Sequence, residues 1–184
     1  MRVISGSAKG RRLQSVPGNS TRPITDRVKE SLFNIIGPDI RESTFLDMFA
    51  GTGSVGIEAL SRGAASALFI DSDQKAIGTV RANLELTKLA GRARVVRGDA
   101  LSFLEGPVTS NYDYVYIAPP QYKGIWKTTL ELIDRQLDWL SVDAWVIVQI
   151  HHRESEPVDL NRLVEFDRRS YGSTTLIFYQ EEGT

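Results

Sequence analysis

The order of apolar runs along the chain is the feature that most restricts its fold. From Thr44 onward, short apolar runs alternate with stretches of helical periodicity, which is typical of βα units packed around a parallel sheet. The expected strands are Phe45–Phe49, Ala67–Ile70, Ala93–Val96, Tyr112–Ile117 and Ala144–Ile150. The helices expected between them are Val55–Arg62, Gln74–Leu89 and Trp126–Leu140.

The last two expected strands, Leu163–Ser170 and Thr174–Gln180, are connected differently. Only three residues separate them, and so short a connection forms an antiparallel hairpin, because a parallel pair needs a long crossover. A parallel sheet that ends in such a hairpin is typical of methyltransferases, whereas a dehydrogenase continues with a sixth parallel strand. We therefore predict a doubly wound, mostly parallel, seven-stranded α/β sheet of the Rossmann-like, class I methyltransferase type.

Residues 1–38 are predicted to form a small basic extension of a sheet domain that spans residues 39–184. The first 30 residues contain seven Lys or Arg and two acidic residues, although the whole chain has a net charge of −1. Such an arm indicates either a polyanionic partner or only a solvated, charged extension.

Local patterns predict a hairpin and a helix in this extension. Short strands are expected at Val3–Ser5 and Arg12–Ser15, with Gly10 in the turn between them. Thr25 is a plausible N-cap for the helix that follows, and Gly37-Pro38 should end it.

The composition excludes several kinds of site. The chain has no cysteine, which rules out disulfides, thiolate nucleophiles and cysteine-bound metals. No segment approaches the roughly 18 apolar residues of a membrane helix, and the N-terminus has no signal-peptide core. We expect a protein of the cytoplasm, or of an organelle such as the chloroplast after processing, with no membrane or metal partner. His151 and His152 are interpreted as a solvated strand end.

A glycine-rich loop follows the first expected strand. Gly51, Gly53 and Gly56 satisfy the G-x-G-x-x-G pattern, whose glycines let the backbone turn sharply and approach a ligand closely. The pattern alone does not choose between a nicotinamide dinucleotide and S-adenosylmethionine. Asp47 favours the second, because a carboxylate repels a pyrophosphate but attracts the ammonium of a methionine moiety.

Two further strand ends carry acidic residues that suit a nucleoside. Asp71 would accept hydrogen bonds from both ribose hydroxyls, or it would cap the next helix, a role that Ser72 or Asp73 could equally fill. Asp99 would accept from the adenine amino group, or it too would be an N-cap. The predicted cofactor-binding residues are Asp47, Phe49, Ala50, Gly51, Thr52, Gly53, Asp71, Ser72, Asp99 and Ala100.

Two prolines at the end of the fourth strand indicate where a methyl acceptor would lie. Pro119 and Pro120 lock φ, so the carbonyls around them are held rigidly, and such acceptors orient an exocyclic amine. Tyr122 would stack on a base swung out of its helix. The alternative is that the two prolines only end the strand.

With these motifs, the chain resembles the RsmD-like group of bacterial small-subunit (16S) ribosomal RNA guanine-N2 methyltransferases over nearly its whole length. The matching segments are Thr21-Arg22-Pro23, Asp26–Glu30, Leu32-Phe33-Asn34, Leu46–Gly53, Gly56–Ala64 and Tyr171-Gly172. The resemblance implies S-adenosylmethionine as cofactor and guanine N2 as target, in free RNA or in a partly assembled small subunit. It also implies a basic N-terminal unit that holds the RNA, with contacts from Lys9, Arg11, Arg12, Arg22 and Arg27.

The chain departs from the family pattern at the expected catalytic segment, Ala118-Pro119-Pro120-Gln121-Tyr122. Ala118 replaces the usual Asp or Asn, and Gln121 is inserted before the aromatic residue. Either the Gln121 amide oxygen and the neighbouring carbonyls replace the lost acceptor, or the chain binds cofactor and RNA with little or no catalysis. An amino-methyltransferase for another nucleic acid is a further alternative. We expect an active enzyme, because the cofactor loop, the two prolines and Tyr122 are all retained.

Overall fold

The computed structural model describes residues 1–18 and 24–183. Its strands are β1 (Thr44–Asp47), β2 (Ser66–Asp71), β3 (Ala93–Arg97), β4 (Tyr112–Ile117), β5 (Leu140–His151), β6 (Leu163–Tyr171) and β7 (Thr174–Glu181). Its helices are α1 (Asp26–Ile36), α2 (Ser54–Ser61), α3 (Gln74–Thr87), α4 (Ala100–Glu105) and α5 (Ile125–Arg135). Short 3-10 turns are η1 (Gly37–Ile40), η2 (Ala90–Arg92), η3 (Leu137–Trp139) and η4 (His152–Glu154).

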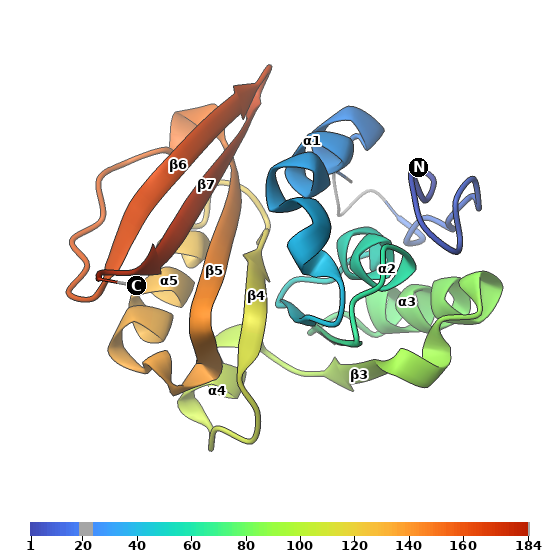
Figure 1. Ribbon diagram of the computed structural model, residues 1–184, viewed down its shortest axis with the longest axis horizontal. Coiled ribbons are helices and arrows are strands. Elements are labelled where there is room, and N and C mark those ends of the chain that lie inside the picture. Colours follow the sequence, from blue (N-terminus) through green and yellow to red (C-terminus); the bar gives the residue numbers. More distant parts are fainter. Residues whose placement is uncertain (19–23, 184) are drawn as a thin grey trace.

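The strands form one seven-stranded sheet in the order β3-β2-β1-β4-β5-β7-β6. Strands β1 to β5 pair in parallel, and β7 runs antiparallel to both β5 and β6. Helices cover both faces, because α1, α2 and α3 contribute to one apolar cluster and α4 and α5 to the other (Figure 1). The predicted doubly wound sheet with its C-terminal antiparallel hairpin is confirmed.

The predicted helices differ from the structure most in two places. The helix expected over Trp126–Leu140 ends at Arg135, because Leu137 and Trp139 turn into the core in η3 and β5 then begins at Leu140. Helix α4 was not predicted at all. It has only six residues, which is too short for an apolar periodicity to be read from the sequence.

The N-terminal arm, residues 1–18, forms a short hairpin that is shifted from the expected one. Arg2 and Arg12 form an antiparallel bridge, and the N–H groups of Val3 and Leu13 donate to the carbonyls of Arg11 and Met1 at 3.0 and 3.2 Å. The expected strand Val3–Ser5 is not paired beyond Val3, because the N–H groups of Ile4 and Ser5 donate to the Glu58 carboxylate of α2 at 2.8 and 2.9 Å. Val3, Ala8 and Leu13 of the arm are buried in the same apolar cluster as α1, α2 and α3. The helix predicted after the arm is confirmed at both ends, since Thr25 caps α1 and Gly37 follows its last residue.

Glu58 joins the arm to the rest of the molecule through buried polar contacts. Its side chain and that of Lys29 are both fully buried, and their charged atoms lie 3.6 Å apart. Lys29 Nζ also donates to the Arg2 carbonyl at 2.6 Å, and Arg62 Nε donates to Glu58 at 2.8 Å. Burial lowers the pKa of Lys29, while the charge of Glu58 raises it and so opposes loss of the proton. Glu58 is therefore structural, and it satisfies two backbone donors and two cations at once.

Gly56 allows α2 to pack closely on β2. A β-carbon at this position would lie 2.4 Å from Cε1 of Phe69, whose ring is fully buried. No real β-carbon approaches a neighbour so closely, so any larger residue would push α2 away from the sheet.

We expect Glu58→Ala to lower the free energy of unfolding by about 3–5 kcal/mol, because it leaves Lys29 buried without its ion-pair partner. Urea unfolding of Glu58→Ala beside Glu30→Ala, which removes an exposed glutamate of α1, measures the effect. If both variants unfold at the same urea concentration, the buried network does not stabilise the fold.

We expect Gly56→Ala to destabilise the protein by about 1–3 kcal/mol, because the new methyl group overlaps the Phe69 ring. The matched control is Gly78→Ala in α3, where an added β-carbon meets nothing within 4 Å. The control should gain up to about 1 kcal/mol from higher helix propensity. Thermal unfolding of both variants gives the comparison, and a Gly56→Ala protein as stable as the control would contradict close packing here.

Candidate active site

The glycine loop between β1 and α2 has the backbone conformation that its sequence predicts. Gly51 and Gly53 have φ values of 55° and 76°, a region that L side chains rarely adopt. Gly53 is also the N-cap of α2. The Gly51 N–H donates to Asp71 at 2.8 Å, and the Ala50 N–H donates to the Ile70 carbonyl at 2.9 Å, so the end of β2 holds the loop.

Asp47, the last residue of β1, is a buried carboxylate that lacks a full set of partners. Its side chain is 1% exposed, and one oxygen accepts from the Gly56 N–H at 3.3 Å. The other oxygen, Oδ1, has no hydrogen-bond partner among the described residues. Burial, helped by the charge of nearby Asp71 and opposed by the Gly56 N–H, raises the pKa of Asp47 to about 7. A cationic ligand beside the glycine loop would relieve this deficit, so the site suits the ammonium of a methionine moiety.

Asp71 and Asp99 occupy the ends of β2 and β3 as predicted, but their observed contacts differ. Asp71 accepts from the N–H groups of Gly51 and Asp73, and Asp73 is the residue that caps α3. Asp99 caps α4 by accepting from the Ser102 N–H at 2.9 Å. A carboxylate has about four acceptor positions, so each keeps capacity for a ligand hydroxyl or amine.

The other predicted cofactor residues divide between the loop surface and the interior. Ser72 is exposed and Phe49 is half-buried, whereas Ala100, the first residue of α4, is buried in the core. Thr52 faces the N-terminal arm, because its hydroxyl donates to Met1 Sδ at 3.4 Å and its carbonyl accepts from Asn83 at 2.9 Å. Thr52 therefore supports the loop through its contacts with the arm and α3.

The segment after β4 lies at the same edge of the sheet as the glycine loop. Asp47 is paired in register with Tyr116 of β4, and the Met48 N–H donates to the Tyr116 carbonyl at 3.0 Å. Two residues beyond Tyr116, the predicted catalytic segment begins with half-buried Ala118 and Pro119 and continues with exposed Pro120, Gln121 and Tyr122.

Tyr122 contacts two residues, Glu154 and His151, that were not predicted as site residues. It has a φ of 62°, its side chain is 64% exposed, and its N–H donates to Glu154 at 2.6 Å. Its ring centroid lies 5.5 Å from that of His151. The interpretation of His151 as part of a solvated strand end was wrong, because this side chain is only 9% exposed. Its position at the end of β5, next to β4, was the signal that would have placed it at the site.

The predicted RNA contacts lie on the arm and on α1. Lys9, Arg11, Arg12 and Arg27 are all exposed, and Arg22 falls outside the described residues. The arm reaches the cofactor loop through Asn83, whose buried amide bonds to both the N–H and the carbonyl of Gln14 and to the Thr52 carbonyl.

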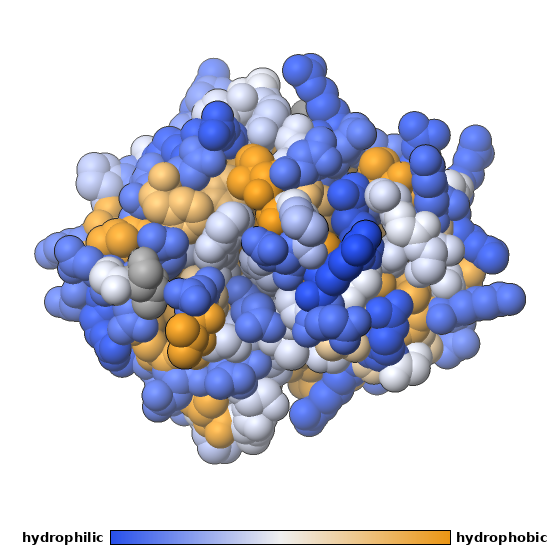
Figure 2. Space-filling view, viewed as in Figure 1, coloured by the Kyte–Doolittle hydropathy of each residue, from blue (hydrophilic) through white to orange (hydrophobic). Residues whose placement is uncertain are grey.

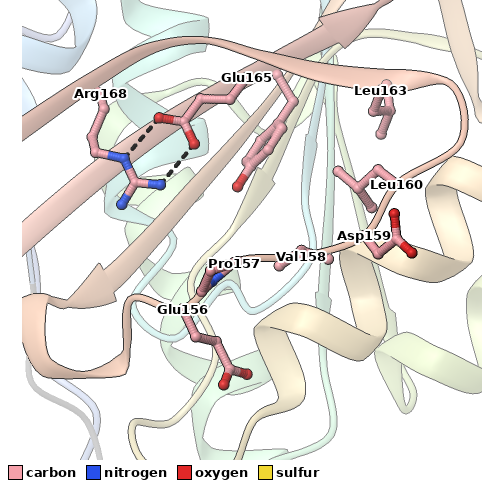
Figure 3. A pocket seen from close by; sticks show the side chains of 9 residues that line it. Glu156, Pro157, Val158, Asp159, Leu160, Leu163, Glu165 and Arg168 are labelled. Atoms are coloured by element: carbon pink, nitrogen blue, oxygen red, sulfur yellow. Dashed lines mark hydrogen bonds and ion pairs between the residues drawn. The ribbon is translucent and has the colours of Figure 1, made fainter.

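A hollow elsewhere on the described surface is separate from the predicted site. A shallow groove of about 280 Å³ lies between the 156–160 loop and the β6–β7 hairpin, where Arg168 pairs with Glu165 (Figure 3). It contains none of the predicted site residues. Apolar side chains are scattered in small patches over the visible face (Figure 2). Within residues 1–18 and 24–183, no cluster of three or more His, Cys, Asp or Glu suits a metal, and no helix is long and apolar enough to cross a membrane.

The chain is similar to known proteins over most of its length. Residues 1–180 match the family described as conserved hypothetical protein 95. The chain is 43% identical to YlbH of Bacillus subtilis over 100% of both proteins. It is 40% identical to Ribosomal RNA small subunit methyltransferase D of Escherichia coli, over 81% of this chain and 74% of that protein.

Solved structures show the same fold. The Escherichia coli protein yhhF superposes with a TM-score of 0.85 at 34% identity, covering 100% of this chain and 99% of that one. An RNA methyltransferase from Salinibacter ruber, in complex with S-adenosyl-L-homocysteine, shares the fold at a TM-score of 0.67 and 16% identity, over 89% and 96% of the two chains. The chain therefore belongs to the conserved hypothetical protein 95 family and is a relative of the RsmD group, as its motifs predicted.

Proposed function

We propose that this protein is an S-adenosylmethionine-dependent methyltransferase that modifies the exocyclic N2 amine of a guanine in small-subunit ribosomal RNA. The observation that carries the proposal is the incompletely bonded, buried carboxylate of Asp47, which lies between the glycine loop and the strand that leads to Pro119-Pro120. The Escherichia coli relative, named Ribosomal RNA small subunit methyltransferase D, supports ribosomal RNA as the substrate. The N2 position rests on the motif resemblance.

The residues at the ends of β1, β2 and β3 fit the parts of this cofactor. Asp47 would hold the ammonium group, and the Gly51–Gly53 backbone would approach the ligand closely. Asp71 and Ser72 would bind the ribose hydroxyls, and Asp99 would accept from the adenine amine. When bound, S-adenosylmethionine supplies an electrophilic methyl group on a cationic sulfonium.

The segment after β4 would orient the methyl acceptor. The amide oxygen of Gln121, together with the carbonyl of Ala118 or Pro119, would accept hydrogen bonds from the two N–H groups of the amine and turn it toward the methyl group. Tyr122, with most of its ring exposed, would stack on the target base. Ala118 supplies no side-chain acceptor, so Gln121 takes that role in this chain.

The basic N-terminal extension, residues 1–38, would bind the RNA backbone. Its exposed cations lie on an arm that packs against α2 and α3 and bonds to Thr52 of the cofactor loop. Lys9, Arg11 and Arg12 on the arm and Arg27 on α1 would neutralise phosphates, and we propose the same for Arg22. The partner would be small-subunit RNA, free or in a partly assembled subunit.

The direct test is transfer of radiolabelled methyl from S-adenosylmethionine into small ribosomal subunits that lack the modification, with the nucleoside identified by mass. We expect labelled N2-methylguanosine from the unaltered protein. Gln121→Ala should slow transfer about 10²- to 10³-fold, the usual effect of losing one preorganised polar contact. Gln136→Ala, at the far end of α5, is the matched control and should be unaffected.

Other outcomes of this assay would change the assignment. No transfer, with S-adenosylhomocysteine binding still measurable, would make the chain a binding protein without catalysis. Label in a different nucleoside would refute guanine N2 as the target.

The raised pKa of Asp47 predicts a pH-dependent affinity for the cofactor. Only the ionised carboxylate attracts an ammonium, so S-adenosylhomocysteine affinity should rise up to about tenfold per pH unit towards pH 7 and then level off. Isothermal calorimetry from pH 5 to pH 8 measures this dependence. Asp47→Asn should bind weakly and without this rise, and a similar rise in the variant would exclude Asp47 as its source.

The raised pKa of Asp47 also makes the stability of the ligand-free protein depend on pH. Its contribution to stability falls as pH rises, whereas the cofactor affinity rises. Native Asp47 keeps a proton that the unfolded chain releases near its ordinary pKa of 3.8, so the carboxyl favours folding below that pH. This contribution is lost as pH rises from about 4 to about 7. Unfolding free energies of the unaltered protein and Asp47→Asn should therefore diverge over this window, with the variant relatively more stable at pH 8.

A further inference from the structure

The aromatic residue that follows the two prolines is held from a neighbouring strand end. Tyr122 N donates to Glu154 Oε1 at 2.6 Å, and its ring lies 5.5 Å from the ring of His151. The φ of 62° at Tyr122 is a conformation that a side-chain-bearing residue adopts only when its surroundings stabilise it. The Glu154 carboxylate provides that stabilisation, because it accepts from the backbone of the strained residue itself.

Glu154 is fixed in turn by the end of the sheet. Its second oxygen accepts from the His151 N–H at 3.2 Å, and His151 Nδ1 accepts from the Arg153 N–H at 3.2 Å. His151 is paired with Thr174 in the β5–β7 ladder, and the His152 N–H donates to the Ser173 carbonyl at 2.9 Å. These hydrogen bonds fix the η4 turn relative to β5 and β7. Because Glu154 of this turn binds the Tyr122 N–H, they also fix the backbone of Tyr122.

Gln121 separates the aromatic residue from the two prolines. Because it stands between Pro120 and Tyr122, the rigid prolines alone do not determine where the ring lies. Strands β4 and β5 are parallel neighbours, with Ile117 opposite Val148, so the turns that follow them meet at one edge. A carboxylate at the start of the turn after β5 can therefore reach the segment after β4.

We propose that Glu154 is a positioning residue that, together with His151, holds the Tyr122 ring where the target base stacks. The inference rests on the proposed function and deepens it by assigning the support of the acceptor site. Glu154 acts only through Tyr122: it binds the Tyr122 backbone, and His151 lies against the Tyr122 ring.

The test is a double-mutant cycle with Glu154→Ala, Tyr122→Ala and the combined variant, assayed on small subunits that lack the modification. Each single variant should lower kcat/KM about 10- to 100-fold, the range for loss of one base–aromatic stack. The combined variant should be no worse than Tyr122→Ala, because both changes remove the same platform. Affinity for S-adenosylhomocysteine should be unchanged in all three.

Two further variants separate positioning from a general effect of charge or stability. Glu154→Gln keeps one oxygen that can accept from the Tyr122 N–H, so it should recover part of the lost kcat/KM. Glu156→Ala removes an exposed glutamate two residues along the same loop, whose partner is Lys127 at 3.3 Å. It should behave like the unaltered protein.

The outcomes distinguish this inference from the proposed function. If the unaltered protein transfers methyl and the losses from the two single variants multiply, Glu154 does not act through Tyr122 and the inference is overturned. A Glu154→Ala variant with the same kcat/KM as the unaltered protein would overturn it as well. If the unaltered protein transfers no methyl, the proposed reaction fails, and the same cycle is measured as affinity for small-subunit RNA. If the two single variants and the combined variant then bind the RNA equally weakly, so that the losses do not add, positioning is supported. Unchanged RNA affinity would refute it.

Discussion

The parallel pairing of β1 with both β2 and β4 is the constraint on which the rest of the structure depends. The order in which strands are added reverses at β1. From β1 the chain forms β2 and β3 on one side and then returns to form β4 and β5 on the other. At such a switch point the loops after adjacent strands diverge and leave a crevice. Asp47 ends the central strand at this point. The end of β2 holds the glycine loop that follows it, and the Met48 N–H donates to Tyr116 of β4, the strand that leads to the 118–122 segment.

Two buried carboxylates, Glu58 and Asp47, have different roles in this protein. Glu58 is buried with its acceptors filled, so it links α1, α2 and the N-terminal arm into one body. Asp47 is buried with one oxygen unfilled, and its pKa is raised accordingly. A fully satisfied carboxylate stabilises a fold, whereas an unsatisfied one favours whichever ligand completes it. The two residues thus combine a rigid support with a site prepared for a cation.

The acceptor side depends on contacts between segments that are distant in sequence. Tyr122 and Glu154 are 32 positions apart, and they meet because β4 and β5 are adjacent. The arm shows the same principle, because Asn83 of α3 joins Gln14 to Thr52. The arm, the glycine loop and the 118–122 segment are therefore each held by residues that are distant in sequence.

Sequence alone determined the alternation of strands and helices, the closing hairpin and the glycine loop, because these depend on local periodicity and on φ values that only glycine adopts readily. It also located Asp47, Asp71 and Asp99 at strand ends. The tertiary structure decided what each of them contacts: Asp99 caps α4, and Asp71 bonds to the loop. It also shifted the pairing of the expected N-terminal hairpin, in which Ile4 and Ser5 bond to Glu58, and it brought His151 and Glu154 to Tyr122. Such contacts are long-range, and they follow from strand order and burial, which periodicity along the chain does not encode.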